Sequence, residues 1–144
     1  MTEGIIIQRA SSVEPSESLT RLFSDLYGHP LVPDTQRINA LIGAGSLAFY
    51  LMTRNGVTIG MASVIPCRTA TSDKLWIEDV CILEEYRGKG LGKNFVRLIM
   101  DDAAAYFGGG TFWLTSNPSR VYARKLYPSL GFTEYETGVF FKTI

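Results

Sequence analysis

The sequence has little of what metal sites, disulfide frameworks and membrane spans are made from. Its 144 residues include only two cysteines and one histidine. A zinc site would have few ligands, and we expect Cys67 and Cys81 to be reduced thiols of a cytoplasmic protein. The apolar run at 5–7 is too short for a secretory signal, and no stretch is long enough to span a bilayer. The sequence therefore argues against a metalloprotein and a membrane protein.

The sequence also lacks an excess of charge of either sign. It carries 14 basic and 14 acidic residues, for a formal net charge of zero. Proteins that bind nucleic acid or anionic membranes usually carry a net positive charge or a basic segment, so we expect neither kind of partner. With 46% hydrophobic residues, a chain of this length can bury one core but is small for two domains. We expect a single domain over residues 1–144.

Glycine, by contrast, is concentrated in one place. Residues 87–93 read Arg-Gly-Lys-Gly-Leu-Gly-Lys, between an apolar run at 75–83 and a helical pattern at 91–107. Glycine lacks a Cβ, so successive amides can point at one anion, and the following helix adds its free N–H groups and the positive end of its dipole. With the cations Arg87, Lys89 and Lys93 around it, this glycine turn predicts a pyrophosphate-binding site.

Two well-known phosphate-binding turns fit the glycine turn poorly. A P-loop has Gly-Lys followed by Ser or Thr, whereas Gly92-Lys93 is followed by Asn94. A dinucleotide-binding turn has the pattern G-x-G-x-x-G after the first strand of a βαβ unit. Here the turn lies in mid-chain and reads G-x-G-x-G. Taken by itself, the glycine turn leaves ATP or GTP as the alternative ligand.

The rest of the chain alternates between strand and helix patterns. Asn55-Gly56, the strongest short hairpin signal, joins strands at 47–54 and 57–65. A strand at 74–83 is apolar on both faces, as central strands are, and period two places its Glu78 and Asp79 on opposite faces. The same patterns predict strands at 4–9 and 111–115 and a final hairpin of 132–136 with 139–143. They also predict a helix at 15–27, a short helix that begins after Asp34, and a helix that runs from Asn117 as N-cap to Leu130.

The glycine turn and the segment after it resemble the GNAT superfamily of acetyl-CoA-dependent N-acetyltransferases. The superfamily pattern Gln/Arg-x-x-Gly-x-Gly/Ala is matched from Arg87 to Gly92, and Leu-Tyr-x-x-Leu-Gly-Phe at 126–132 follows at the superfamily's interval. The resemblance covers nearly the whole chain. It implies a mixed α/β (α+β) fold, with a central, twisted, mostly antiparallel sheet of six to seven strands flanked by about four helices.

The resemblance implies an acyltransferase that moves the acetyl group of acetyl-CoA to a primary amine by direct attack in a ternary complex. An alkyl ammonium has a pKa of about 10, so a carboxylate must take its proton. Glu78 is the candidate general base, because the run at 77–80 resembles that of the glucosamine-6-phosphate N-acetyltransferases. The alternative is a strand carboxylate paired with a cation such as Lys74 or Arg68. Tyr127 is the candidate general acid. The alternative is that Tyr127 has no catalytic role and only lies beside the core-facing residues of its helix.

Acetyl-CoA is the co-substrate that the resemblance implies, with no metal. In this superfamily the pantetheine arm lies along a central strand like an additional strand, and an amide at Val80 or Cys81 would face the thioester oxygen. Asn117 matches a position that often meets the pantetheine, although capping a helix explains it equally well. The residues expected to bind acetyl-CoA are Val80, Cys81, Ile82, Arg87, Gly88, Lys89, Gly90, Leu91, Gly92, Lys93 and Asn117.

The acceptor is left open by the sequence. The resemblance makes the first two helices one wall of the acceptor pocket, and a small molecule or a peptide could supply the amine. A non-catalytic acyl-CoA-binding module or sensor on the same fold is the alternative function. The oligomeric state is open as well, with a homodimer among the alternatives.

Overall fold

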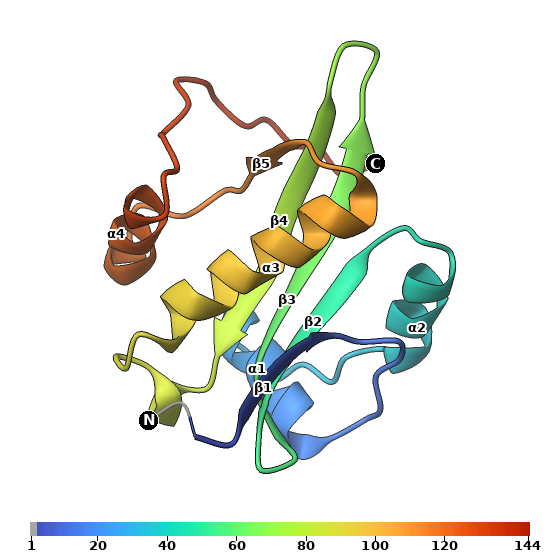
Figure 1. Cartoon of the computed structure of the whole chain (residues 1–144), viewed down its shortest axis with the longest axis vertical. Helices are drawn as coiled ribbons and strands as arrows, with labels where there is room; N and C mark the ends of the chain where they lie inside the picture. The colour runs from blue at the N-terminus through green and yellow to red at the C-terminus, as the bar shows by residue number, and fades with distance from the viewer. Residues whose placement is uncertain (1–2) are drawn as a thin grey trace.

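The computed structural model describes residues 3–144, which form one open sheet with helices on both faces (Figure 1). The strands stand in the order β1-β2-β3-β4-β5, and neighbours are antiparallel except for β4 and β5, which are parallel. The mixed α/β class expected from the sequence is confirmed. The strands are β1 Ile5–Arg9, β2 Ala48–Arg54, β3 Val57–Arg68, β4 Asp73–Ile82 and β5 Thr111–Trp113.

Four α-helices accompany the sheet within the described residues. Helix α3 crosses the face nearest the viewer in Figure 1, whereas α1 lies behind the sheet against β3 and β4, and α4 stands beyond β5. No helix in residues 3–144 is long and apolar enough to cross a bilayer. The helices are α1 Glu17–Tyr27, α2 Thr35–Gly43, α3 Leu91–Phe107 and α4 Val121–Ser129, and a short 3₁₀ helix, η1, covers Glu84–Tyr86.

The ends of most elements follow the sequence signals. Ser16 and Asp34 cap α1 and α2, each accepting a hydrogen bond from the backbone N–H three residues further on. Gly108 ends α3 in the left-handed conformation. At the tip of the β2–β3 hairpin, Asn55 and Gly56 both have positive φ, of 50° and 82°, as the favoured two-residue turn requires. These boundaries confirm the sequence-based prediction.

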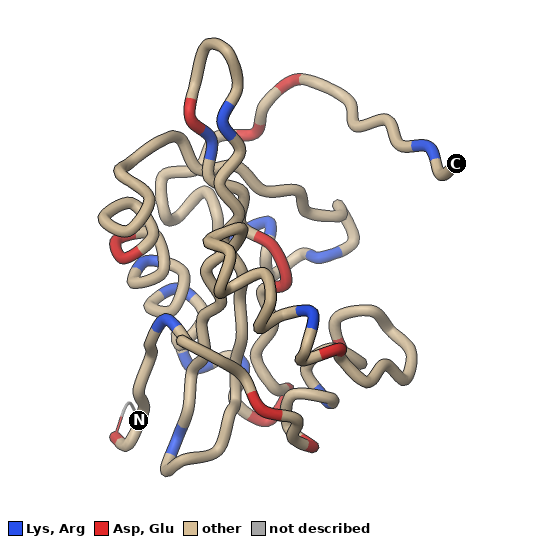
Figure 2. The backbone as a smooth tube through the Cα atoms, turned by 90° about the vertical axis from the view of Figure 1, so that its right-hand side faces the viewer, with Lys and Arg blue, Asp and Glu red and all other residues tan. Residues whose placement is uncertain are grey.

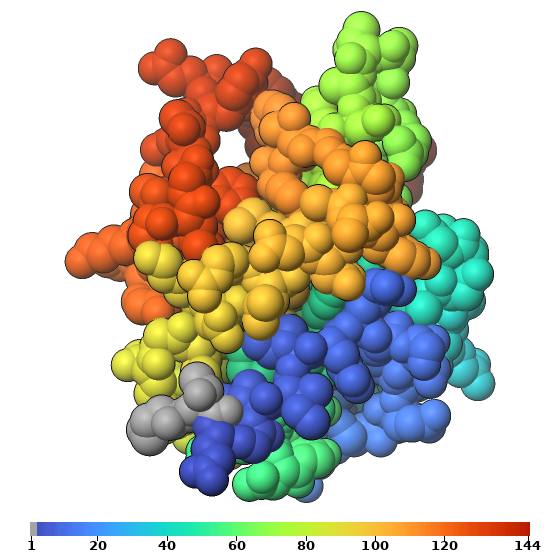
Figure 3. Space-filling view, viewed as in Figure 1, coloured from blue at the N-terminus to red at the C-terminus, as the bar shows by residue number. Residues whose placement is uncertain are grey.

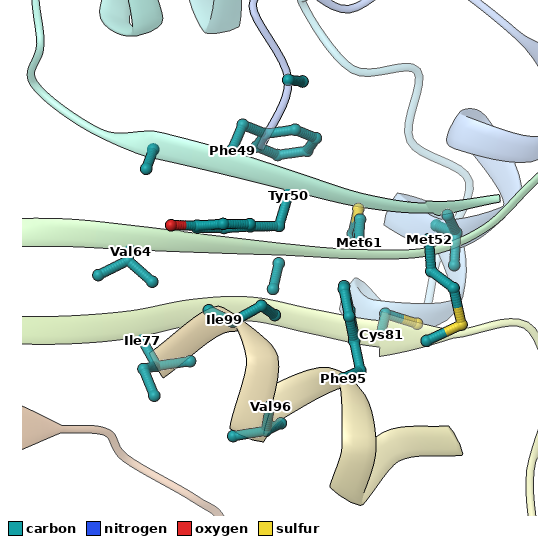
Figure 4. Close-up of a cluster of buried hydrophobic side chains, with 14 of the residues drawn as sticks. Phe49, Tyr50, Met52, Met61, Val64, Ile77, Cys81, Phe95, Val96 and Ile99 are labelled. Carbon is teal, nitrogen blue, oxygen red and sulfur yellow. The ribbon is translucent and has the colours of Figure 1, made fainter. Parts of the chain in front are cut away.

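The main core lies between α3 and the sheet. Tyr50 and Val64 of the sheet and Phe95 and Ile99 of α3 are all fully buried and face one another (Figure 4). The Tyr50 hydroxyl lies at the edge of this apolar core and donates a hydrogen bond to Asp102 Oδ2 at 2.7 Å. The core therefore fixes α3, and with it the glycine turn, against the strands.

The predicted final hairpin is wrong. Residues 132–144 contain no strand, and the sheet of the described chain has five strands rather than six to seven. The two-residue connection Thr137-Gly138 lacks the residues that readily take positive φ at both positions, in contrast to Asn55-Gly56. A two-stranded hairpin that packs on nothing is also marginal in water. The chain therefore runs on after Glu136 without reversing.

The predicted start of the last helix is wrong as well. Helix α4 begins at Val121 with Arg120 as N-cap, instead of at Pro118 with Asn117 as N-cap. Asn117 Oδ1 accepts a hydrogen bond from Ser119 N at 2.9 Å, and Asn117 O accepts one from Arg120 N at 2.9 Å. Asn117 thus forms a local turn, an alternative that asparagine side chains commonly offer the backbone.

Candidate active site

The glycine turn lies between η1 and the start of α3. Gly88 and Gly90 both have a φ of 76°, and a Cβ placed on either would meet no atom within 4 Å. Gly90 is the N-cap of α3 and has no side chain to bond the first amides of the helix. An uncapped helix start that opens onto empty space can accept an anionic group, since its N–H groups and dipole both favour negative charge.

The three cations of the glycine turn differ in their surroundings. Lys93 is exposed and projects from the first turn of α3. Lys89 Nζ donates to Glu85 O at 3.1 Å. Arg87 turns back toward the strand, where its Nε donates to Ile82 O at 2.7 Å, and its guanidinium lies 3.8 Å from Asp25 of α1. All three cations are exposed, but Arg87 anchors the end of β4, whereas Lys93 extends from the helix start.

Strands β4 and β5 separate halfway along β4. Their pairing ends at Trp76 and Trp113, after which β4 continues to Ile82 while the chain after β5 turns toward α4. Within the described chain, the edge of β4 from Ile77 to Ile82 therefore has no strand beside it on this side. Its main-chain groups are available to an extended ligand, as an exposed sheet edge is in β-strand addition.

The expected strand and turn residues lie along this edge. Val80 and Ile82 are half-buried, and Cys81 is 6% exposed. Burial raises the pKa of the Cys81 thiol even though the Arg87 guanidinium opposes the shift, and a raised pKa disfavours the thiolate form that a nucleophile needs. The side chain of Leu91 is part of the core, which leaves its main chain for a ligand.

A β-bulge in β4 changes the side to which Asp79 points. Ser63 of β3 faces Glu78, but Met61 faces Cys81, so two steps along β3 match three along β4. Asp79 takes up the extra residue with a φ of 57°. The Ser63 hydroxyl donates to Asp79 Oδ2 at 2.9 Å, so both carboxylates lie on the Ser63 side of the sheet. The expectation of opposite faces is wrong because period two fails at a bulge.

The two carboxylates share an environment that disfavours negative charge. Partial burial raises the pKa of Glu78, and the nearby Asp79 raises it further. Burial also raises the pKa of Asp79, and the Ser63 hydrogen bond limits this rise. Tyr27, at the end of α1, has a raised pKa mainly because Asp79 lies near it, with smaller contributions from burial and then from Glu78. Raised carboxylate pKa values bring these groups closer to the neutral range in which a general base works best.

Tyr127 lies on α4, a different element from the strand that carries the two carboxylates. Its ring packs edge-on against Phe132, with centroids 5.6 Å apart. Burial raises the pKa of Tyr127, and Arg120 partly opposes this. Pro128 is accommodated inside α4, which ends one residue later at Ser129. Within residues 3–144, no hydrogen bond or ring contact joins Tyr127 to Glu78, so the structure does not bring the two candidates into direct contact.

Sequence reasoning missed two residues of this site, Ser63 and Tyr27. Ser63 is 1% exposed, and it is the one buried polar residue in the described part of the chain. A hydroxyl within the apolar run of β3 was a readable signal, because a buried polar group needs a partner. Tyr27 gave no such signal. In residues 3–144 no cluster of three metal-ligating side chains occurs.

Several known proteins with similar folds are acetyltransferases by name. A putative acetyltransferase from Agrobacterium tumefaciens is 23% identical, with a TM-score of 0.74 over 96% of this chain and 99% of that one. An aminoglycoside acetyltransferase from an uncultured soil metagenomic sample is 16% identical, with a TM-score of 0.80 over 100% and 99% of the two chains. A predicted acetyltransferase from Clostridium acetobutylicum, solved with acetyl-CoA, is 15% identical, with a TM-score of 0.75 over 96% of each chain. The sequence profile of the acetyltransferase (GNAT) family matches residues 14–132, so the resemblance seen in the glycine turn is confirmed. The chain belongs to the acetyltransferase (GNAT) family.

Proposed function

We propose that the chain is an N-acetyltransferase that moves the acetyl group of acetyl-CoA to a primary amine of a small, positively charged acceptor. The observation that carries this proposal is the Glu78–Asp79 pair, held on one face of β4 beside the unpaired strand edge. Two neighbouring carboxylates attract an ammonium group and repel a phosphate. The same pair thus serves both acceptor binding and proton removal.

The residues around the unpaired edge suit coenzyme A. The open, uncapped start of α3 and Lys93 would hold the pyrophosphate, and the main chain of Val80 to Ile82 would hold the pantetheine arm. When bound, acetyl-CoA supplies the acetyl thioester. These contacts use main-chain groups and one cation, which the described structure leaves accessible at this edge.

The side chains divide the proton chemistry between them. Glu78 is exposed enough to meet an acceptor, and its raised pKa improves its match to an ammonium group as a general base. Asp79 strengthens this effect through its charge. Tyr127, whose raised pKa keeps its hydroxyl protonated, would return a proton to the leaving thiolate. The name of the aminoglycoside acetyltransferase with a similar fold supports a polyamine-like acceptor.

Thiol release from acetyl-CoA, followed with a panel of amines, tests the proposal. The panel holds an aminoglycoside, a linear polyamine, an amino sugar phosphate, an amino acid and a short peptide. We expect release with the polycationic amines and little with the amino sugar phosphate. Tight binding of CoA without release for any amine would support a non-catalytic acyl-CoA-binding module instead. The amino sugar phosphate as best acceptor would contradict the charge argument.

A further inference from the structure

Helix α1 contacts the segment that leads into the glycine turn through four charged side chains. Arg21 Nη1 and Nη2 donate to Glu85 Oε1 and Oε2, each at 3.0 Å. One helical turn further along α1, Asp25 Oδ2 lies 3.8 Å from Arg87 Nη2. Residues four apart share one face of a helix, so Arg21 and Asp25 present a positive and then a negative charge to partners of matching opposite sign. We call these four residues the α1 ion-pair network.

The pairing of Arg21 with Glu85 has the geometry of a strong ion pair. Two parallel N–H···O bonds give it strength and a fixed orientation. The hydrogen bond to Arg21 lowers the pKa of Glu85, and the same bond raises the pKa of Arg21. Basic and acidic positions are spread over the whole chain in Figure 2. The ion-pair network is therefore a match between particular residues and no general attraction between two surfaces of opposite charge.

The apolar core does not by itself fix the last turn of α1. The buried residues of α1 are Leu19, Leu22 and Phe23. Residues 24–27, which form the last turn, include no buried side chain. Ser24 Oγ accepts a hydrogen bond from Leu31 N at 3.0 Å, which joins this turn to the following loop. The contact between Asp25 and Arg87 joins it to the glycine turn instead.

The ion-pair network connects the two halves of the candidate active site. Tyr27, two residues after Asp25, lies near the Glu78–Asp79 pair. The partners of α1 come directly before Gly88, and the glycine turn, in yellow in Figure 3, lies at the surface where a ligand can reach it. The position of Tyr27 beside the carboxylates is thus linked to the segment that leads into the glycine turn.

We propose that Arg21 and Asp25 are positioning residues that hold the last turn of α1, and with it Tyr27, beside the amine acceptor. This inference rests on the proposed function. The two residues act through α1 and Tyr27 rather than by contact with the reacting atoms. Loss of the ion pairs should therefore weaken acceptor binding. It should leave the rate at saturating acceptor unchanged, because Glu78 is held separately on β4.

Arg21→Glu, which places two carboxylates against each other, tests the proposal together with the exchanged pair Arg21→Glu/Glu85→Arg. Thiol release is measured at saturating acetyl-CoA with the panel amine that reacts fastest. We expect Arg21→Glu to raise KM for the amine by about threefold or more, within the range that exposed ion pairs allow, with kcat unchanged. The exchanged pair should restore the native KM. Arg68→Gln, which removes an exposed ion pair of the same 3.0 Å length to Asp73, is the matched control and should change neither constant.

Hydrogen exchange of the α1 amides, recorded without ligand, measures the ion pairs independently of turnover. We expect faster exchange at 25–28 in Arg21→Glu and native exchange in the exchanged pair. Unchanged exchange in Arg21→Glu would overturn the proposal, as would faster exchange with an unchanged KM. A higher KM that the exchanged pair does not reverse would overturn it too. A native chain that acetylates no amine of the panel would contradict the proposed function and this inference together, whereas the other contrary outcomes leave the proposed function standing.

Discussion

Ser63 Oγ donates a hydrogen bond to Asp79 Oδ2 at 2.9 Å, across a bulge at which Asp79 has a φ of 57°. Ser63 is 1% exposed, so its hydroxyl finds its partner within the protein rather than in water. Aspartate is one of the few residues that tolerate positive φ. The bond and the bulge together hold the Asp79 carboxylate on the face of Glu78. The pH dependence of activity should therefore be a joint property of Glu78 and Asp79.

Glu78→Gln should remove the acidic limb of the kcat/KM profile. The base acts only when it is deprotonated, so activity should rise with pH through the pKa of Glu78, which burial and Asp79 raise above its usual value. Without the carboxylate we expect a loss of about 100-fold or more in kcat, the contribution typical of a general base. Affinity for CoA, measured by calorimetry, should stay unchanged because the cofactor contacts do not need this side chain.

Asp79→Asn should shift the acidic limb to lower pH and keep it. The negative charge of Asp79 raises the pKa of Glu78, and asparagine removes that charge while it still tolerates the left-handed conformation. The test compares the pH profiles of kcat/KM for Asp79→Asn and Glu78→Gln, recorded with the same acceptor. A limb that disappears in Asp79→Asn and persists in Glu78→Gln would identify Asp79 as the base.

Ser63→Ala should destabilise the protein more at pH 8 than at pH 4. The hydroxyl favours the ionised form of Asp79, whose pKa is raised by burial. When the bond is lost, a partly buried carboxylate is left without its donor, at a cost of about 1–3 kcal/mol. The cost is present above the raised pKa, where Asp79 is charged, and fades as pH falls through it. Urea unfolding at both pH values measures the difference.

The matched test for Ser63 uses a background in which Asp79 has no charge. In Asp79→Asn chains, the further change Ser63→Ala should cost less, and its cost should not depend on pH. Equal costs in both backgrounds would mean that Ser63 stabilises the fold by packing alone. The double-mutant cycle isolates the hydrogen bond, since the two residues are in direct contact.

The parts predicted well from the sequence depend on local signals. Asn55-Gly56 specifies its turn through two residues that tolerate positive φ, and Ser16 and Asp34 cap helices through bonds that span three residues. The glycine turn was found because its glycines and the following helical pattern are adjacent in the chain. In each case the physical cause lies within a few residues, so one sequence suffices.

The parts predicted wrongly depend on contacts between distant segments. The register between β3 and β4, with one extra residue in β4, decides the face of the sheet on which the Asp79 side chain lies. The predicted hairpin at 132–143 failed because strand propensity does not specify a partner, and within residues 3–144 no strand pairs with this segment. Asn117 had two local alternatives, a cap and a turn, and the turn prevailed.

Gly90→Val should abolish CoA binding, whereas Gly45→Val should leave it unchanged. Both glycines have positive φ, of 76° and 71°, and a Cβ at either meets no atom within 4 Å. Both substitutions should therefore cost a similar conformational penalty, about 1–2 kcal/mol. Only Gly90 lies at the open start of α3, where a branched side chain would fill the space of the pyrophosphate.

Calorimetric titration with CoA and a thermal melt of each variant make the comparison. We expect at least a tenfold loss of affinity for Gly90→Val, equivalent to about 1.4 kcal/mol, and similar melting temperatures for the two variants. Equal CoA affinity in both would rule out the glycine turn as the pyrophosphate site. Lys93→Ala should weaken CoA binding by a smaller factor. Arg37→Ala, which removes an exposed cation on α2, should leave CoA binding unchanged.

Tyr127→Phe should lower kcat by about 100-fold and leave CoA affinity unchanged. Phenylalanine keeps the ring that packs edge-on against Phe132 at 5.6 Å, so the substitution removes little besides the hydroxyl, and general acids typically contribute this much. Burial raises the pKa of Tyr127, so the native hydroxyl should stay protonated up to and beyond the usual tyrosine value of about 10. Tyr122→Phe, on the exposed side of the same helix, is the control and should keep full activity. A similar loss in both variants, or weaker CoA binding in Tyr127→Phe, would mean that the Tyr127 hydroxyl supports the structure of α4 and does not transfer a proton.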